Sequence, residues 1–156
     1  MNDRTLKKLQ KILFTRDIGI SYNPLSDETD PLSNPLLNKA MEKASSAVIV
    51  PKDSTRSPVN FAASLKPDFK KTAFILIPGQ CFDKEGARRG RGNGWYDRFL
   101  SRVPKNWIRI GVTNKKYFSR TPLNQNSWDE PMDWVMCERN KMWTLYKTGA
   151  RIKNPS

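Results

Sequence analysis

A glycine- and arginine-rich segment at residues 86–94 has the residue types in this chain that are best suited to chemistry. It contains Gly86, Gly90, Gly92 and Gly94 together with Arg88, Arg89 and Arg91. Glycines allow backbone angles that turn successive N–H groups toward one anion, and arginines bond phosphoryl oxygens in pairs. The segment therefore predicts a phosphate-binding loop, and the alternative is an ordinary glycine-rich surface turn.

The residues after this loop have a helical pattern. Trp95, Tyr96, Phe99 and Leu100 recur at helical spacing, which predicts that the loop delivers its anion to a helix N-terminus. Asp97 falls in the first turn, where a carboxylate is placed to hold Mg²⁺ against bound phosphates. The alternative is that Asp97 only complements the helix dipole.

The segment from Leu76 to Leu100 resembles the signature of the 5-formyltetrahydrofolate cyclo-ligase family. In that family a strand ending in Pro-Gly, a Phe-Asp pair and an Arg-x-Gly-x-Gly-x-Gly-Tyr-Tyr-Asp loop follow one another at fixed spacing. The residues in register here are Pro78, Gly79, Phe82, Asp83, Gly86, Arg88, Gly90, Gly92, Gly94, Tyr96 and Asp97.

The resemblance continues on both sides of this segment. Upstream, Tyr22-Asn23-Pro24 and Glu28-Thr29-Asp30 resemble a Tyr-x-Pro-x-x-x-Glu-x-Asp element whose glutamate contacts folate in the family. Downstream, Thr121-Pro122 and the stretch 128–135 resemble the family's Leu-Pro and His-Asp-x-Pro-Val-Asp segments. The similarity covers residues 18–138, with gaps.

The resemblance implies ATP- and Mg²⁺-dependent cyclisation of 5-formyltetrahydrofolate to 5,10-methenyltetrahydrofolate, with release of ADP and phosphate. The implied catalytic residues are Arg88 and Asp97. The implied ATP-binding residues are Arg88, Gly90, Arg91, Gly92, Asn93, Gly94, Trp95, Tyr96 and Asp97. The implied folate-binding residues are Glu28 and Tyr96, and the candidate magnesium ligands are Asp97, Asp129 and Asp133.

Several of these residues have structural alternatives. An aromatic residue at helical spacing, such as Tyr96, is more often part of a core. Glu28 is equally suited to starting a helix, and Asp129 and Asp133 to capping a turn.

The chain departs from the family pattern in two regions. Tyr22 follows only 21 residues, where the family has about two helices, and Ser57 stands where a further strand and helix end in a Glu-Pro pair. The second departure favours another hypothesis, a paralogue that binds nucleotide or another small anionic substrate without cyclo-ligase activity. A third hypothesis for the function is a basic RNA-binding module on the same fold. It would use Trp95, Trp107, Trp128 and Tyr117 as exposed aromatic residues for base stacking.

Composition limits the partners and the kinds of site. The 156 residues carry 28 Lys and Arg against 15 Asp and Glu, a net charge of +13, which favours an anionic partner. Two cysteines and no histidine argue against a disulfide framework or a Cys/His metal site.

The sequence predicts one domain over 1–156 with a basic C-terminal tail, and leaves the oligomeric state open. It also predicts no membrane span and a cytoplasmic location, the alternative being an organelle-targeting peptide in the basic first 16 residues.

Alternating strand and helix patterns predict an α/β fold, a mostly parallel sheet flanked by helices in three layers. The expected helices are residues 4–15, 35–44 and 97–102. The expected strands are residues 17–22, 47–50, 73–77, 108–113, 134–137 and 142–146, and residues 52–71 are expected to form a loop. Ligands of such sheets bind at the carboxyl ends of the strands, which is where residues 78–94 would lie.

Overall fold

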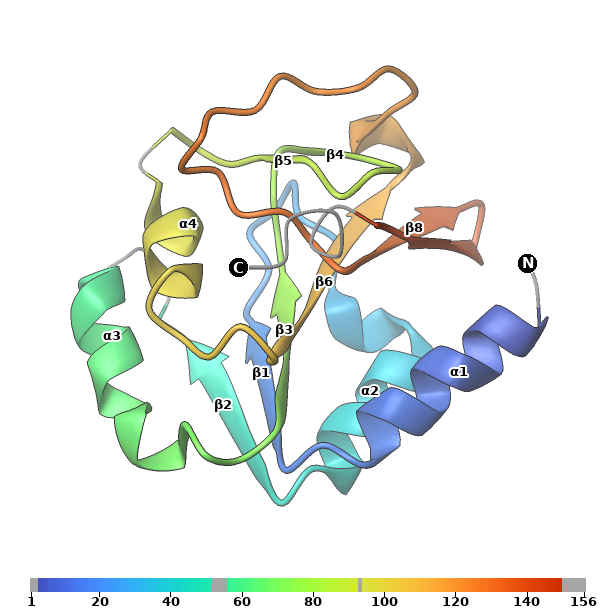
Figure 1. Ribbon diagram of the computed structural model, residues 1–156. Helices are drawn as coiled ribbons and strands as arrows, with labels where there is room; N and C mark the ends of the chain where they lie inside the picture. Colours follow the sequence, from blue (N-terminus) through green and yellow to red (C-terminus); the bar gives the residue numbers. More distant parts are fainter. Residues whose placement is uncertain (1–2, 52–55, 93, 150–156) are drawn as a thin grey trace.

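A computed structural model describes residues 3–51, 56–92 and 94–149 of the chain, and it confirms the predicted α/β fold (Figure 1). The central sheet has six strands in the order β2-β1-β3-β6-β8-β9, and every neighbouring pair is parallel except the β8–β9 hairpin. The strands are β1 (Ile18–Tyr22), β2 (Ser46–Val50), β3 (Ala73–Ile77), β6 (Ile108–Asn114), β8 (Trp134–Arg139) and β9 (Met142–Lys147).

Helices cover both faces of this sheet, so its inner strands are buried on both sides. The unbroken apolar run of β3 is buried at all five positions. On one face lie α1 (Asp3–Phe14) and α2 (Pro35–Lys43), and on the other α3 (Pro58–Ser64) and α4 (Trp95–Leu100) (Figure 1). Short 3₁₀ helices are η1 (Pro31–Ser33), η3 (Lys66–Asp68) and η4 (Lys115–Tyr117).

The N-terminal helix is part of the folded core. Leu9 and Leu13 of α1 are at most 1% exposed and pack in the same cluster as Leu37 of α2 and Phe74 of β3. In the part of the chain that the structure describes, no helix combines the length and the apolar composition needed to cross a membrane.

The prediction of a loop over residues 52–71 is wrong, because α3 and η3 lie within that range. Ser57 caps α3, its Oγ accepting a hydrogen bond from the Asn60 N–H at 3.0 Å, and Pro58 occupies the first turn. Serine at the N-cap and proline at the next position are helix-start signals. Phe61 of α3 then packs against Phe99 of α4, with ring centroids 5.2 Å apart.

A second, three-stranded sheet that the sequence did not predict lies over the carboxyl ends of the central strands. It consists of β4 (Cys81–Asp83), β5 (Arg88–Arg89) and β7 (Phe118–Ser119), in the order β5-β4-β7. The buried Asp83 organises it: Oδ1 accepts hydrogen bonds from the N–H groups of Glu85 and Ala87, and Oδ2 accepts one from Leu123, each at 2.9 Å.

The strand order reverses between β1 and β3. The chain moves outward from β1 to β2, then returns to the other side of β1 and continues to β6. In open α/β sheets such a switch point leaves a crevice at the carboxyl ends of the two strands, and ligands bind there. The topology therefore predicts a ligand site among the residues that follow β1 and β3.

Candidate functional site

Three loops, which follow β1, β5 and β7, meet at the carboxyl end of the sheet. Arg91 of the glycine loop forms ion pairs with Asp27 and with Glu28, whose Oε2 is 3.4 Å from the Arg91 Nε, so the loop after β1 is tied to the glycine loop. Glu28 also accepts a hydrogen bond from the Leu25 N–H at 2.9 Å, and its side chain is only 7% exposed. The structure thus brings together Glu28 and Arg91, two candidates that lie 63 positions apart in the chain.

Arg88 lies on a strand, not in a flexible loop. Its Nε donates to the Pro78 carbonyl oxygen at 2.6 Å, and its guanidinium lies 5.0 Å from the ring centroid of Tyr96. Burial lowers the pKa of Arg88, and the negative charge of Asp97 acts in the opposite direction. Arg88 is therefore a fixed, partly buried cation at the rim of the site.

The glycines of the loop differ in what they contribute. Gly92 and Gly94 have φ of 93° and 65°, angles that side chains rarely adopt, while Gly90 does not have a positive φ. A Cβ on Gly90 would instead lie 3.1 Å from the guanidinium nitrogens of Arg88, so this glycine provides room for that side chain. Helix α4 has six residues, and its dipole is accordingly small beside the charge of the arginines.

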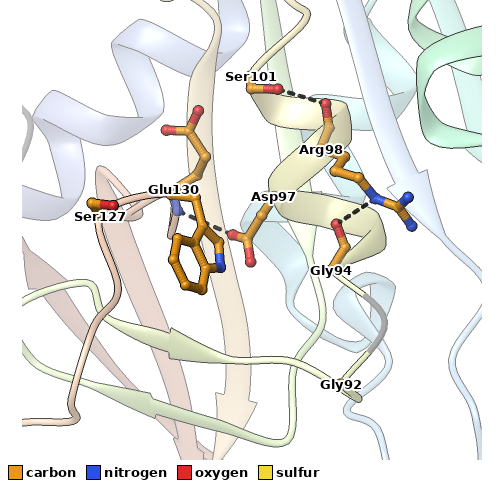
Figure 2. Close-up of a pocket in the computed structure, with 8 residues that line it drawn as sticks. Gly92, Gly94, Asp97, Arg98, Ser101, Ser127 and Glu130 are labelled. Carbon is orange, nitrogen blue, oxygen red and sulfur yellow. Dashed lines mark hydrogen bonds between the residues drawn. The ribbon is translucent and has the colours of Figure 1, made fainter.

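Asp97 points from α4 toward Glu130, which belongs to the segment between β7 and β8 (Figure 2). Its Oδ1 accepts a hydrogen bond from the Glu130 N–H at 3.0 Å. Burial raises the pKa of Asp97; the Glu130 N–H bond and Arg88 lower it, and the carboxylates of Asp129 and Glu130 add to the rise. A carboxylate whose charge is disfavoured in this way gains from a nearby cation.

Two cavities adjoin one another around Asp97. The first, of about 360 Å³, is called the arginine cavity and is lined by Arg88, Arg89, Gly90, Arg91, Gly92, Gly94, Trp95, Asp97, Asn124, Asn126, Trp128 and Asp129. The second, of about 560 Å³, is called the tryptophan cavity and is lined by Gly92, Gly94, Asp97, Arg98, Ser101, Ser127, Trp128 and Glu130 (Figure 2). The two cavities share Gly92, Gly94, Asp97 and Trp128, so these residues lie between two neighbouring hollows.

The candidate magnesium ligands separate into two places. Asp129 lines the arginine cavity with Asp97, and its Oδ2 accepts a hydrogen bond from the Asn126 N–H at 2.8 Å. Asp133 comes immediately before β8, at the amino end of that strand, where its Oδ2 accepts a hydrogen bond from the Arg109 N–H at 2.8 Å. The structure therefore does not bring Asp133 to the other two. Within the described ranges no group of three His, Cys, Asp or Glu side chains is arranged to hold a metal.

The aromatic candidates are mostly core residues. Trp95 is 5% exposed and donates its indole N–H to the Arg56 carbonyl at 3.0 Å, although it also lines the arginine cavity. Tyr96 packs against the same core cluster, and burial raises its pKa. Trp107 is fully buried, so the prediction of exposed stacking aromatics is wrong for Trp95 and Trp107, whereas Trp128 is 69% exposed. Asn93 lies outside the described residues, as do the last residues of the predicted basic C-terminal tail, 150–156.

Sequence reasoning did not assign a site role to several residues that contact or line the site. These are Asp27, Ser101, Asn124, Asn126, Ser127 and Glu130. Most lie in the irregular segment between β7 and β8, whose position depends on long-range contacts. One such contact is the buried Arg109 of β6, whose guanidinium donates to Glu130 Oε2 at 3.1 Å and to the Leu100 carbonyl at 3.3 Å.

Comparison with known protein families matches the part of the chain that contains most of this site. The sequence model of the 5-formyltetrahydrofolate cyclo-ligase family matches residues 52–138, which is more than half of the chain. This chain belongs to the 5-formyltetrahydrofolate cyclo-ligase family. The match includes the glycine loop, α4 and the segment up to β8, and so it contains both walls of the two cavities.

Similarity to individual members of the family is more limited. A 5-formyltetrahydrofolate cyclo-ligase of Mycoplasma genitalium is 34% identical over 63 residues, which are 40% of this chain and 37% of that protein. The chain thus matches little more than a third of that relative's length. The solved structure of a 5,10-methenyltetrahydrofolate synthetase from Mycoplasma pneumoniae has a TM-score of 0.55 and 20% identity, covering 85% of this chain and 82% of that one. At this identity, the likeness shows the fold alone.

Proposed function

We propose that this protein is a ligase that converts 5-formyltetrahydrofolate to 5,10-methenyltetrahydrofolate, with conversion of ATP to ADP and phosphate. The observation that carries the proposal is the meeting of Glu28, Arg88, Arg91 and Asp97 at the switch point of the sheet. Membership of the cyclo-ligase family supports the same reaction. ATP-dependent chemistry also fits the cytoplasmic location that the sequence predicts. The two core clusters lie on the two faces of one sheet, which supports a single domain.

The proposed chemistry needs a phosphate chain held next to a formyl group. The formyl oxygen attacks the γ-phosphorus, the bond to the bridging oxygen breaks and ADP leaves. N10 then attacks the formyl carbon and loses its proton to solvent, the carbon–oxygen bond breaks and phosphate leaves. Arg88 and Arg91 stabilise the phosphoryl oxygens during these displacements, since charge and positioning account for most catalysis of phosphoryl transfer. Glu28, beside Arg91, binds the folate.

The carboxylates present fit a magnesium ion that arrives with ATP. Mg²⁺ is commonly held by one or two carboxylates, with phosphate oxygens and waters completing its shell. Asp97 and Asp129 both line the arginine cavity and are the two carboxylates assigned to the ion. Bound there, Mg²⁺ would neutralise charge on the phosphates. Asp133 is not part of this assignment, because it lies at the amino end of β8 and accepts a hydrogen bond from the Arg109 backbone there.

The test measures the methenyl absorption band after mixing purified protein with MgATP and 5-formyltetrahydrofolate. The wild type is expected to produce the band only when both substrates are present. Asp97→Asn keeps an oxygen for the Glu130 N–H but removes the charge, and it is expected to lower the rate by 100-fold or more, on the order of the effect of losing one electrostatic contact in the transition state. Asp68→Asn, on the exposed η3, is the matched control and is expected to leave the rate unchanged. Folded wild-type protein that binds ATP and produces no band would refute the proposal.

One observation favours the second candidate function, a paralogue that binds a nucleotide or another small anion without this activity. Strand β2 ends at Val50 and α3 begins at Pro58, so the chain has no room for the further strand and helix of the family pattern. The resulting edge strand leaves Ile49 45% exposed. This candidate predicts ATP binding that depends on Arg88 without methenyl formation. The RNA-binding alternative has less support, because Trp95 and Trp107 are buried.

A further inference from the structure

Trp128 differs from the other tryptophans of this chain in its exposure. It is 69% exposed, whereas Trp95, Trp107 and Trp134 are at most 5% exposed and Trp143 is partly buried. Exposed aromatic rings are used at binding surfaces, where the face of the ring stacks on a ligand. Trp128 also lines both the arginine cavity and the tryptophan cavity. Its ring is therefore available to a ligand that extends from one cavity into the other.

The order of residues across the site indicates which part of a ligand would reach Trp128. Glu28 contacts Arg91, and Arg91 lines the arginine cavity but not the tryptophan cavity. Asp97 lines both cavities, and Trp128 lies with it between them. From one side to the other, the site thus runs from the folate candidate through the arginines and the metal candidate to the indole.

This order matches the order of groups that the proposed reaction requires. The γ-phosphate must meet the formyl group, so the phosphate chain lies between the folate and the nucleoside. If folate lies at Glu28 and the phosphates lie in the arginine cavity, the tryptophan cavity adjoins the phosphates through Asp97 and Trp128, away from Arg91 and Glu28, which is where the nucleoside would lie. Its volume of about 560 Å³ is within the usual range for small-ligand sites.

We infer that the tryptophan cavity is the nucleobase subsite of this protein, with the purine ring of ATP stacked on the indole of Trp128. The inference rests on the proposed function for the placement of the phosphates. Polar side chains also line this cavity (Figure 2): Ser101, which follows α4, and Ser127 and Glu130 of the segment between β7 and β8. Their hydroxyl and carboxylate oxygens are suited to the ribose hydroxyls. Every base has a π-face, so stacking alone predicts little discrimination between ATP and GTP.

The experiment compares a ligand with a base to a ligand without one. Binding of MgATP and of magnesium tripolyphosphate is measured by calorimetry for wild type, Trp128→Ala, Trp128→Phe and the control Trp143→Phe. Stacking of one base on an aromatic ring predicts about a 10-fold weaker affinity of Trp128→Ala for MgATP. Its affinity for tripolyphosphate is expected to stay within about 2-fold of wild type, since the arginines are intact. Trp128→Phe is expected to retain most of the MgATP affinity, and Trp143→Phe all of it.

Fluorescence gives an independent readout in the wild-type protein. MgATP is expected to change the emission of the exposed Trp128, and tripolyphosphate is expected to leave it nearly unchanged. The change is expected to disappear in Trp128→Phe and to persist in Trp143→Phe. A response of the same size to both ligands would indicate a general conformational change and would overturn the stacking assignment.

The outcomes separate this inference from the proposed function. Equal MgATP affinity of wild type and Trp128→Ala overturns the subsite, even if the protein forms the methenyl product. Equal losses for MgATP and tripolyphosphate overturn it too, because the residue then acts through the fold. Binding of 5-formyltetrahydrofolate is measured in the same way. If Trp128→Ala weakens it and leaves MgATP binding unchanged, the cavity belongs to the pteridine ring and the inference is overturned. If MgATP binding depends on Trp128 but no cyclisation occurs, the subsite stands and the proposed function fails.

Discussion

Arg88 and Arg91 hold their charges in different ways. Arg88 is fixed by the Pro78 carbonyl and the Tyr96 ring, and burial already disfavours its charge. Arg91 is exposed and paired with Asp27 and Glu28, carboxylates that a phosphate group can replace. The pair with Asp27 is exposed on both sides, and exposed ion pairs contribute little to stability, so replacing this pair costs little. Arg88 therefore supplies a preorganised contact and Arg91 an adjustable one.

Asp97 combines a proposed functional role with a cost to stability. Its pKa is higher in the folded chain than in the unfolded chain, mainly because of burial. The free energy of unfolding therefore falls as the pH rises from the ordinary carboxyl pKa of 3.8 through the raised value of the folded state, and it stays lower above that value. Asp97→Asn avoids this cost and keeps an acceptor for the Glu130 N–H. We expect the variant to melt about 1–3 °C higher than wild type at neutral pH, after allowance for solvent screening.

Thermal unfolding followed by circular dichroism at two pH values tests this prediction. The difference between Asp97→Asn and wild type is expected to shrink at a pH of about 4, where the unfolded carboxyl group is partly protonated. The control Asp68→Asn removes an exposed carboxylate paired with Lys71 at 3.1 Å and is expected to give no rise at either pH. If Asp97→Asn melts at or below the temperature of wild type at neutral pH, burial does not disfavour the charge of Asp97 as inferred.

The small sheet is the element that fixes the site over the larger sheet. Asp83 accepts three backbone hydrogen bonds, two within the β4–β5 hairpin and one from Leu123 in the segment after β7. The hairpin carries Arg88, and the segment after β7 continues to Asn124 and Trp128. A single buried carboxylate thus connects the two walls of the arginine cavity.

Removal of this carboxylate is expected to destabilise the fold. Asp83→Ala leaves three backbone N–H groups without their acceptor, and we expect the free energy of unfolding to fall by about 2–4 kcal/mol. Asp83→Asn retains one oxygen and is expected to lose roughly half as much. Urea unfolding monitored by circular dichroism gives both values. The control Glu85→Ala, at an exposed neighbour, is expected to stay within about 0.5 kcal/mol of wild type, and an equal loss there would contradict the special role of Asp83.

The regular elements were predictable from the sequence because their signals are local. The apolar run of β3 gave its bounds, 73–77, without error, and the helical patterns placed α1 and α2 to within about one residue. The Ser57-Pro58 start of α3 is a local signal too, but it was interpreted as loop punctuation. The two-residue strands β5 and β7 have no pattern of their own and depend on pairing with β4.

The candidate site was predictable only where one segment carried it. Residues 86–97 were assigned together because they are adjacent in sequence and resemble one family motif. The pairing of Arg91 with Asp27 and the placing of Trp128 beside Asp97 depend on the switch point and on the long segment between β7 and β8. For the same reason Asp133 was grouped with Asp129 by sequence, although the fold separates them.

At the scale of the whole molecule, positive charge attracts anions without selecting among them. The chain carries a net charge of +13, and residues 79–156 hold 16 Lys and Arg against 7 Asp and Glu. Such a field speeds the approach of ATP and of RNA alike. Selection then depends on the cavities, which have the size of a small ligand, while the surface charge is open to any polyanion.

Salt dependence separates these two kinds of binding. RNA displaces counterions along its length, so we expect its affinity for this protein to fall about 10-fold or more between 50 and 200 mM salt, by the usual dependence on the number of phosphates neutralised. MgATP carries few charges and is held in a cavity, and its affinity is expected to fall about 3-fold or less over the same range. Fluorescence anisotropy of a labelled single-stranded RNA and calorimetry with MgATP provide the two curves. Arg88→Ala is expected to weaken MgATP binding and to leave RNA binding nearly unchanged, because RNA contacts the exposed cations. Tight RNA binding at 200 mM salt that MgATP displaces would instead place RNA in the cavities and make an RNA-binding module the better description.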